Sequence, residues 1–350
     1  MKRTFLFVTF LLTLSASVFC LPSLIDSQLF KTSETKNLNF DLAWEDIDIQ
    51  QSNDTEKIHV EVYCNKEKYA PTINFSNSTI YVKSNKNKPN FGIQNLKCTV
   101  IIKIPASTQF KSINFETTSG DIQSQIIINA NTLSIESTSG DQSFTKDLFA
   151  QNATFKATSG DVFVDSLYGQ NLKAETTSGS IKFNTFEGQN ASLGATSGSI
   201  KLINATIEKT LVKTSSGSIT IEGTVSNAFD ITATSGTIGL ELDAAPSAKS
   251  RITSTSGTIF LGLPGNDDFS LWVQTTGGSF TNAITKEKIS DHANYKQNIN
   301  DGGALIMLSS TSGRITVDSN NGITGAIIDD KIDKDVPVVS FAKPTPIQGC

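Results

Sequence analysis

The sequence predicts an all-β protein, a single-chain β-solenoid (β-helix) of about ten to thirteen coils with a period of 19–21 residues and irregular N- and C-terminal caps. Three observations predict this fold. A pentapeptide, Thr-Ser-Gly-[Asp/Ser/Thr]-[Ile/Val], recurs through the middle of the chain, apolar residues alternate with polar ones on both sides of it, and no helical period competes. A unit this short cannot bury its apolar face alone, so the repeats must stack.

The glycine of the pentapeptide defines each repeat and predicts a turn. Glycine supplies a positive φ without steric cost, and the neighbouring hydroxyl or carboxylate bonds to local backbone. Successive glycines are 20, 20, 19, 19, 19, 19, 21, 21 and 35 residues apart. The predicted turn glycines are Gly120, Gly140, Gly160, Gly179, Gly198, Gly217, Gly236, Gly257, Gly278 and Gly313.

Two short strands flank each of these turns. In the first repeat Ile113 and Phe115 precede Gly120 and Ile122 follows it, with the period of two that a half-buried strand shows. A leucine-rich repeat would need a leucine ladder, a calcium-binding roll has half this period, and a β-sandwich has no reason to reuse one pentapeptide. A second turn in each coil is predicted by the asparagines Asn131, Asn152, Asn171, Asn190 and Asn227.

These repeats resemble the bacterial-type "putative adhesin" domain family of unknown function, a β-solenoid family that repeats T-S-G-[DS]-[IV] at this spacing. The resemblance covers about residues 38 to 318. Val100–Pro105 and Thr118–Ile122 are similar to the family's entry strand, proline and first coil, and Thr311–Ile315 to its last coil. The resemblance implies adhesion and carries over no catalytic residues.

The N-terminus predicts export to the outside or to the cell surface. Lys2 and Arg3 precede an apolar run from Phe5 to Leu14 and then small residues, the pattern of a signal peptide over residues 1–20. Without its two basic residues the formal net charge of −5 becomes −7, which argues against nucleic acid and anionic membranes as partners. No later stretch reaches 18 apolar residues, so no transmembrane span is predicted in the mature chain.

The four cysteines suit an oxidising compartment. Cys64 and Cys98 lie in the segment before the repeats and are predicted to form a disulfide. Cys20 ends the signal peptide and is either removed or lipidated. Cys350 would then be unpaired, as a free thiol or in a link to another chain.

Four segments are predicted along the chain: the signal peptide (1–20), an N-terminal cap with the first coils (21–110), the repeat solenoid (111–320), and a C-terminal cap strand with a flexible tail (321–350). Caps are expected because terminal units of a stack expose unpaired strand edges. The long interval before Gly313 contains the polar residues 285–301, which predict a loop inserted between two coils.

The candidates for chemistry are few. Asp121, Asp141 and Asp161 share one register in three consecutive repeats and are weak candidates for a calcium site or for the carboxylates of a polysaccharide-cleaving enzyme. Later repeats place Ser or Thr in that register, which favours a common turn role. The two histidines, His59 and His292, have no Cys or His at ligand spacing, so no metal site is predicted, and no nucleophile elbow supports a Ser-His-Asp triad.

Two further sets of side chains recur. Threonines two residues before the glycines could line a sugar- or ice-binding surface, but a turn-capping role is favoured: Thr118, Thr138, Thr158, Thr177, Thr196, Thr234, Thr255 and Thr276. Six N-x-[Ser/Thr] sequons would carry N-glycans in a eukaryotic source: Asn53, Asn74, Asn77, Asn152, Asn190 and Asn204.

The sequence thus predicts a non-enzymatic, secreted or cell-surface, adhesin-like protein that needs no cofactor and binds an extracellular glycan or protein surface. One alternative is a structural envelope or matrix component without a specific ligand. A second alternative is a polysaccharide-acting enzyme that uses the ladder of Asp121, Asp141 and Asp161.

Overall fold

The computed structural model describes residues 21–85 and 96–319, and in these ranges the prediction of an all-β protein is confirmed. Strands run from β1 (Ser23–Lys31) to β25 (Arg314–Ser319), with one short 3-10 turn, η1 (Glu67–Tyr69), between them. Among the described residues, no helix is long and apolar enough to cross a membrane. The chain divides into two compact units, Met1–Leu202 and Ile203–Cys350. The predicted signal peptide and C-terminal segment lie outside the described residues.

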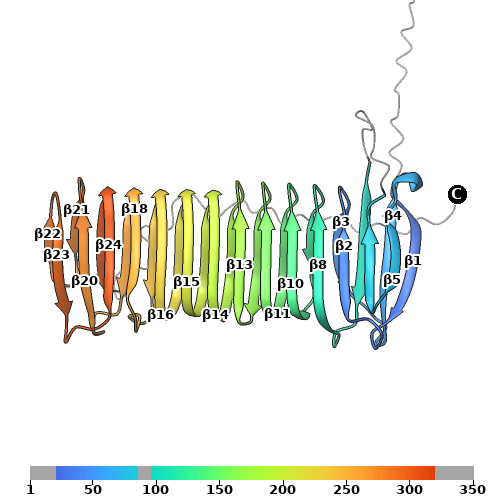
Figure 1. Cartoon of the computed structure of the whole chain (residues 1–350), viewed down its shortest axis with the longest axis horizontal. Helices are drawn as coiled ribbons and strands as arrows, with labels where there is room; N and C mark the ends of the chain where they lie inside the picture. The colour runs from blue at the N-terminus through green and yellow to red at the C-terminus, as the bar shows by residue number, and fades with distance from the viewer. Residues whose placement is uncertain (1–20, 86–95, 320–350) are drawn as a thin grey trace, which may run out of the picture. The chain divides into compact units, whose positions relative to one another are not determined.

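In the first unit the repeats stack as parallel strands, each paired with the equivalent strand of the next repeat (Figure 1). Ile113 pairs with Leu133, Leu133 with Ala153, and the series continues through Leu172 and Ala191. These partners are 20, 20, 19 and 19 residues apart, as the glycine spacing predicts. The strands of this row are β8 (Gln109–Thr117), β10 (Ile128–Ser137), β11 (Gln142–Ala157), β13 (Asn171–Thr176) and β14 (Ile181–Ser197).

A second row of parallel pairs lies after the glycine turns and contains β9 (Ile122–Ser124), the start of β11, β12 (Val162–Tyr168) and the start of β14. The inward side chains of both rows form the core. The Phe155 ring meets Phe144 and Phe183 edge to face, with centroids 5.7 and 5.6 Å apart. All three rings are fully buried, which explains the alternation of apolar and polar residues in the sequence.

One corner of the repeat differs from the prediction. β11 and β14, with 16 and 17 residues, run without a break through Asn152 and Asn190, where a second turn was predicted. Asn171 Nδ2 donates to Asn152 Oδ1 at 2.8 Å, and Asn190 Nδ2 donates to Asn171 Oδ1 at 2.9 Å. The asparagines therefore form a ladder of amide hydrogen bonds between repeats, and the pairing of β10 with β11 continues through the corner.

The repeat glycines are needed for a reason other than the one predicted. Positive φ values occur at Gly236 (+118°) and Gly257 (+153°), but the φ values of Gly140 and Gly198 lie outside that region. A Cβ at Gly140 would lie 1.8 Å from the carbonyl oxygen of Gly120 in the previous repeat. Glycine is thus required because the turns of successive repeats touch backbone to backbone.

At its N-terminal end the first unit contains one more repeat. β2 (Asn37–Asp41) and β3 (Asp46–Gln51) pair in parallel with β8 and β9, whose residues come 75 positions later. Glu45 takes the glycine position, and Gly120 stacks on its carbonyl oxygen. Two later strands also run parallel to β2 and β3 and pair with their other edge. These strands are β6 (Thr79–Lys83), which pairs with β2, and β7 (Cys98–Ile104), which pairs with β3. Stacking order and chain order therefore differ.

Antiparallel strands cover this end of the first unit. β4 (Lys57–Cys64) pairs with β7, β1 pairs with β4, and β5 (Thr72–Ser76) pairs with β6. The last parallel strands, β6 and β7, consequently have partners on both edges. Such cover protects a parallel stack from pairing with a further chain along β6 and β7.

The second unit repeats the parallel pattern. β16 (Ile219–Ser235) pairs with β17 (Ile238–Leu242) and β18 (Ser250–Ser256), and β17 pairs with β19 (Ile259–Leu263). β15 (Ile200–Ser216) contains the boundary between the units. The next partners of β18 and β19 are β24 (Leu305–Ser312) and β25, the last two strands of the described residues. β20 (Phe269–Thr275) and β21 (Ser279–Asn282) pair with the far edge of β24 and β25 (Figure 1).

The loop predicted over residues 285–301 is wrong, because this segment contains two strands. β22 (Glu287–Ile289) pairs antiparallel with β21, and β23 (Asn294–Ile299) pairs antiparallel with β20. The segment is polar because β23 exposes alternate side chains, among them Asn294 and Lys296, while Ile299 is buried. The repeat of Gly313 is also not last in the stack, since Gly278 stacks on its carbonyl oxygen.

Candidate functional site

A shallow groove of about 320 Å³ crosses four repeats of the first unit beside the glycine turns. Its walls come from equivalent positions of successive repeats, so each row of side chains follows the stacking direction. A charged row contains Glu116, Glu136, Lys156 and Glu175, one residue from each repeat. An exposed row contains Thr138, Thr158 and Thr177.

The charged row is acidic with one cation at its centre. Lys156 Nζ lies 2.9 Å from Glu136 Oε1. The pKa of Lys156 is raised, first by this hydrogen bond and then by the charges of Glu136, Glu175 and Glu116, which outweigh its partial burial. Lys156 is therefore positive at neutral pH, and the row of three glutamates and one lysine carries two net negative charges.

The hydroxyl groups beside the groove have two separate roles. Thr117 Oγ1 accepts the backbone N–H of Gly120 at 3.0 Å, and Thr176 Oγ1 accepts that of Gly179 at 3.0 Å. In these two repeats the residue three positions before the glycine caps the turn. The sequence predicted this role for the threonine two positions before the glycine. Thr138, Thr158 and Thr177 are exposed, so their hydroxyl groups face the solvent at the groove.

The aspartate ladder joins repeats through their backbones. Asp121 Oδ1 accepts the N–H of Asp141 at 2.9 Å, and Asp141 Oδ1 accepts that of Asp161 at 2.8 Å. The series begins at Asp46, which accepts the N–H of Asp121 at 3.0 Å, and ends where Asp161 accepts the N–H of Ser180 at 2.7 Å. One oxygen of each carboxylate is therefore occupied by a structural bond. Within the described ranges no three His, Cys, Asp or Glu side chains are placed to hold a metal ion.

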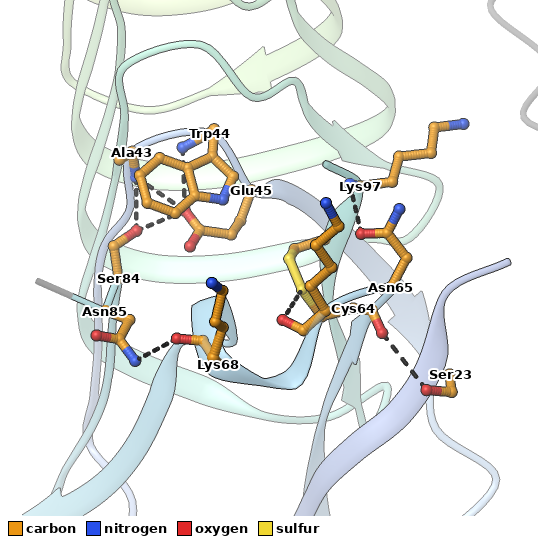
Figure 2. Close-up of a disulfide and its surroundings, with 12 residues drawn as sticks. Ser23, Ala43, Trp44, Glu45, Cys64, Asn65, Lys68, Ser84, Asn85 and Lys97 are labelled. Carbon is orange, nitrogen blue, oxygen red and sulfur yellow. Dashed lines mark hydrogen bonds between the residues drawn. A yellow bond between two sulfur atoms is a disulfide. The ribbon is translucent and has the colours of Figure 1, made fainter. Parts of the chain in front are cut away.

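The disulfide predicted between Cys64 and Cys98 is confirmed (Figure 2). The two residues are direct partners on the antiparallel strands β4 and β7, with Cα atoms 4.1 Å apart. Figure 2 also shows Glu45, whose Oε2 accepts the N–H groups of Ala43 (2.9 Å) and Trp44 (3.0 Å) and the hydroxyl of Ser84 (2.5 Å). The carboxylate thus caps the turn between β2 and β3, which has no glycine.

The remaining predicted residues do not gather at the groove. His292 lies in the second unit beside Asp291, with Nδ1 and Oδ2 2.9 Å apart. His59 lies in β4, where it contacts Ser27 and Glu61. All six sequon asparagines are exposed: Asn53, Asn74, Asn77, Asn152, Asn190 and Asn204.

The charged row of the groove is not among the residues predicted from the sequence. Its signal is visible once the repeats are aligned on their glycines, because Glu116, Glu136, Lys156 and Glu175 each lie four positions before the glycine. Ser27 and Glu61 were missed because nothing in the sequence links them to His59, which is 32 residues from Ser27.

Comparisons with known proteins agree with the observed strand pattern. The chain matches the family model described as Toastrack DUF4097 over residues 35–221 and again over 190–318. No curated protein matches it. A solved structure named "putative adhesin" from Parabacteroides distasonis is 13% identical, with a TM-score of 0.51 over 67% of this chain and 95% of that chain.

Two further solved structures are similar at lower scores. A "putative adhesin" from Parabacteroides merdae is 16% identical, with a TM-score of 0.49 over 66% of this chain and 95% of that one. A "putative lipid binding protein" from Parabacteroides distasonis is 14% identical, with a TM-score of 0.45 over 83% and 96%. At such identities a likeness concerns the fold alone. The family match covers far more than half of the sequence, and the chain belongs to the Toastrack DUF4097 family.

Proposed function

We propose that this chain is a secreted or cell-surface, adhesin-like protein whose repeats bind a glycan or protein partner without altering it. The observation that carries the proposal is the groove of the first unit, where exposed threonines and a charged row repeat in register across four repeats. A partner with its own repeating structure would meet the same set of groups several times. Weak contacts that repeat in this way add up to useful affinity.

The repeats of each unit are proposed to wind as a β-solenoid, with residues 21–110 as an N-terminal cap and first coils. Parallel pairing between residues 19–21 positions apart supports this winding, because a chain must return to the same face once per repeat to pair so. The scaffold would keep the spacing of the groove residues fixed, so little ordering entropy is lost when a partner binds.

The chemistry of the groove suits a polar partner. Three glutamates and three threonines offer acceptors and hydroxyl groups for a sugar or for an extended peptide, and Lys156 offers a single donor cation. The alternative of a polysaccharide-cleaving enzyme has less support, because Asp121 and Asp141 hold backbone N–H groups of the next repeat. A purely structural envelope component would need no regular spacing of exposed groups, and binding experiments separate that alternative from the proposal.

Export is supported by two features. The disulfide between Cys64 and Cys98 suits an oxidising compartment, and the N-terminal residues have the pattern of a signal peptide. The six exposed sequons would accept glycans in a eukaryotic secretory pathway.

The proposal is tested by binding of the exported chain, without residues 1–20, to glycan arrays and to intact cells. A groove variant, T138V/T158V/T177V, removes three hydroxyl groups with little change of shape. We expect it to bind at least about tenfold more weakly, a loss of about 1.4 kcal/mol. The matched control is Q151A/Q170A/Q189A, which changes another exposed row of the same unit and should bind as the parent does.

Absence of binding to every glycan and cell type tried would favour the structural alternative. Release of soluble fragments from a polysaccharide, lost in the D121N/D141N/D161N variant, would favour the enzyme. Equal losses in the groove variant and in its glutamine control would place the binding surface elsewhere.

A further inference from the structure

Three side chains of the N-terminal cap lie in contact with one another, in series, outside the groove. Ser27 Oγ lies 2.7 Å from His59 Nε2, and His59 Nδ1 lies 3.2 Å from Glu61 Oε1. A serine, a histidine and a carboxylate in this order have the connectivity of a nucleophile, its base and the group that orients the base.

The strand register brings the three residues together. In the antiparallel pair of β1 and β4, Ser27 is opposite Glu61, and Leu29 is opposite His59. His59 and Glu61 are two positions apart on one strand, so their side chains leave the same face of the sheet. β7 adds Lys103, the strand partner of His59.

Glu61 is held firmly from three sides. Its Oε1 is 2.7 Å from Lys103 Nζ, and its Oε2 accepts the Tyr63 hydroxyl at 3.2 Å. The pKa of Tyr63 is raised, first by burial and then by the nearby charge of Glu61, so this phenol keeps its proton and remains a donor. Glu61 itself is only 6% exposed.

This arrangement sets the tautomer of His59. The Glu61 carboxylate beside Nδ1 favours the neutral tautomer of His59 that carries its proton on Nδ1, and in that tautomer Nε2 keeps its lone pair. The Ser27 hydroxyl then donates to Nε2. The nucleophilic oxygen is exposed, while its base is only partly exposed and the orienting carboxylate is buried.

We propose that Ser27 is an activated acyl acceptor, which takes an acyl group from an activated ester. Ser27 Oγ attacks the carbonyl carbon while its proton moves to His59 Nε2. The bond from that carbon to the aryl oxygen breaks, and the departing aryloxide takes the proton from His59. The products are the Ser27 ester and the free phenol, and neither a metal nor an oxidant is needed.

The same geometry limits the reaction to activated donors. The backbone N–H of Ser27 donates to Asp26 Oδ1 at 2.8 Å, so it does not serve a developing oxyanion. A missing oxyanion donor typically costs a factor of about 10² to 10³ in rate, whereas a positioned base supplies about 10² to 10⁴. Aryl esters and fluorophosphonates have good leaving groups and tolerate that loss. This reactivity is independent of the binding proposed for the groove.

The test treats the exported chain with 4-nitrophenyl acetate and, separately, with a fluorophosphonate probe, and maps the modified peptides by mass spectrometry. The exposed turn serines Ser139 and Ser159 are internal controls in the same molecule. We expect Ser27 to react at least about 100-fold faster than either control serine. S27A should remove the modified peptide, H59Q should slow the reaction about 100-fold, and E61Q should slow it about tenfold.

A thermal melt of each variant shows whether the cap still folds. If H59Q lowers the melting temperature, H59A with added imidazole replaces it, and restored labelling of Ser27 supports the assignment. Labelling of Ser27 no faster than of Ser139, or at the parent rate in a folded H59Q variant, would show that the three side chains only tie β1 to β4.

Discussion

A Cβ placed on Gly198 would lie 1.9 Å from the carbonyl oxygen of Gly179, the equivalent residue of the previous repeat. The same relation holds at Gly140, Gly160 and Gly179, with distances of 1.8 to 2.0 Å. No side chain fits at such a distance from backbone, so the glycines set how closely the turns stack. The pentapeptide recurs because the turn of each of these repeats contacts the turn stacked against it.

Replacing Gly198 by alanine is therefore expected to destabilise the first unit strongly. The backbone of one turn must move by more than an ångström, which should cost about 1 to 3 kcal/mol or more, as overpacking does. Gly194 provides a control in the same repeat, because a Cβ there meets only Glu175 Cγ, at 3.8 Å. Chemical denaturation should show G194A at parental stability and G198A well below it, with G198V lower still. Equal midpoints for G194A and G198A would contradict the assigned contact.

The aspartate ladder predicts that the acceptor oxygen matters and the charge does not. Asp141 Oδ1 holds the N–H of Asp161, so D141A should lose about 1 kcal/mol of unfolding free energy. D141N keeps an acceptor oxygen and removes repulsion from Asp121 and Asp161, so it should be as stable as the parent or more stable. Urea denaturation at low salt measures both. An asparagine variant as unstable as the alanine variant would mean that the negative charge itself is required.

Much of the stacking could be predicted from the sequence, because the spacing of the glycines gives the register between neighbouring repeats. The pairing of Ile113 with Leu133 follows from counting between glycines, and so does the burial of Phe115 and Phe155. These features depend on residues within one repeat and its neighbour. The prediction that successive repeats stack at intervals of 19–21 residues succeeds in the first unit for that reason.

The ends of the two units could not be read in this way. The repeats of Gly278 and Gly313 carry similar motifs, and either could bury the same apolar surface against the repeat of Gly257. The choice depends on the antiparallel cover that β22 and β23 supply, which the motif does not describe. Likewise Glu45 has no sequence signal, because its turn is capped by its own carboxylate and by Ser84.

The groove and the Ser27 site differ in how far they could be predicted from the sequence. The charged row was within reach, since the residue four positions before each glycine is charged in four successive repeats. The Ser27 site was out of reach, because it depends on the antiparallel register between β1 and β4, which no repeat specifies.

The disulfide predicts a large effect of reduction on the first unit. Cys64 and Cys98 are 34 positions apart, and closing a loop of that length stabilises the fold by about 3 to 4 kcal/mol in the chain-entropy model. The C64A/C98A variant should therefore melt at a clearly lower temperature than the parent, and added dithiothreitol should lower the melting temperature of the parent alone. Non-reducing peptide mapping that finds either thiol free would refute the pairing.

Burial of Asp48 predicts a dependence of stability on pH. Its pKa is raised above the ordinary value of 3.8, mainly because burial disfavours the charged form, although the hydrogen bond from Gln50 opposes the shift. The folded state then binds this proton more tightly than the unfolded state does. The favourable contribution is complete below pH 3.8 and is lost as the pH rises through the raised pKa, so the ionised carboxylate weakens the fold at neutral pH.

D48N should consequently be more stable than the parent at pH 7, since the amide oxygen still accepts from Gln50 and carries no charge. This advantage should shrink on acidification and vanish below about pH 3.8, where Asp48 is protonated in both states. Thermal melts of the two proteins at pH 7, 5 and 3 measure the difference, in which the titration of all other carboxylates cancels. The exposed Glu56 is the control, because E56Q should show no such trend. A D48N variant less stable than the parent at pH 7 would mean that the charged carboxylate is needed where it lies.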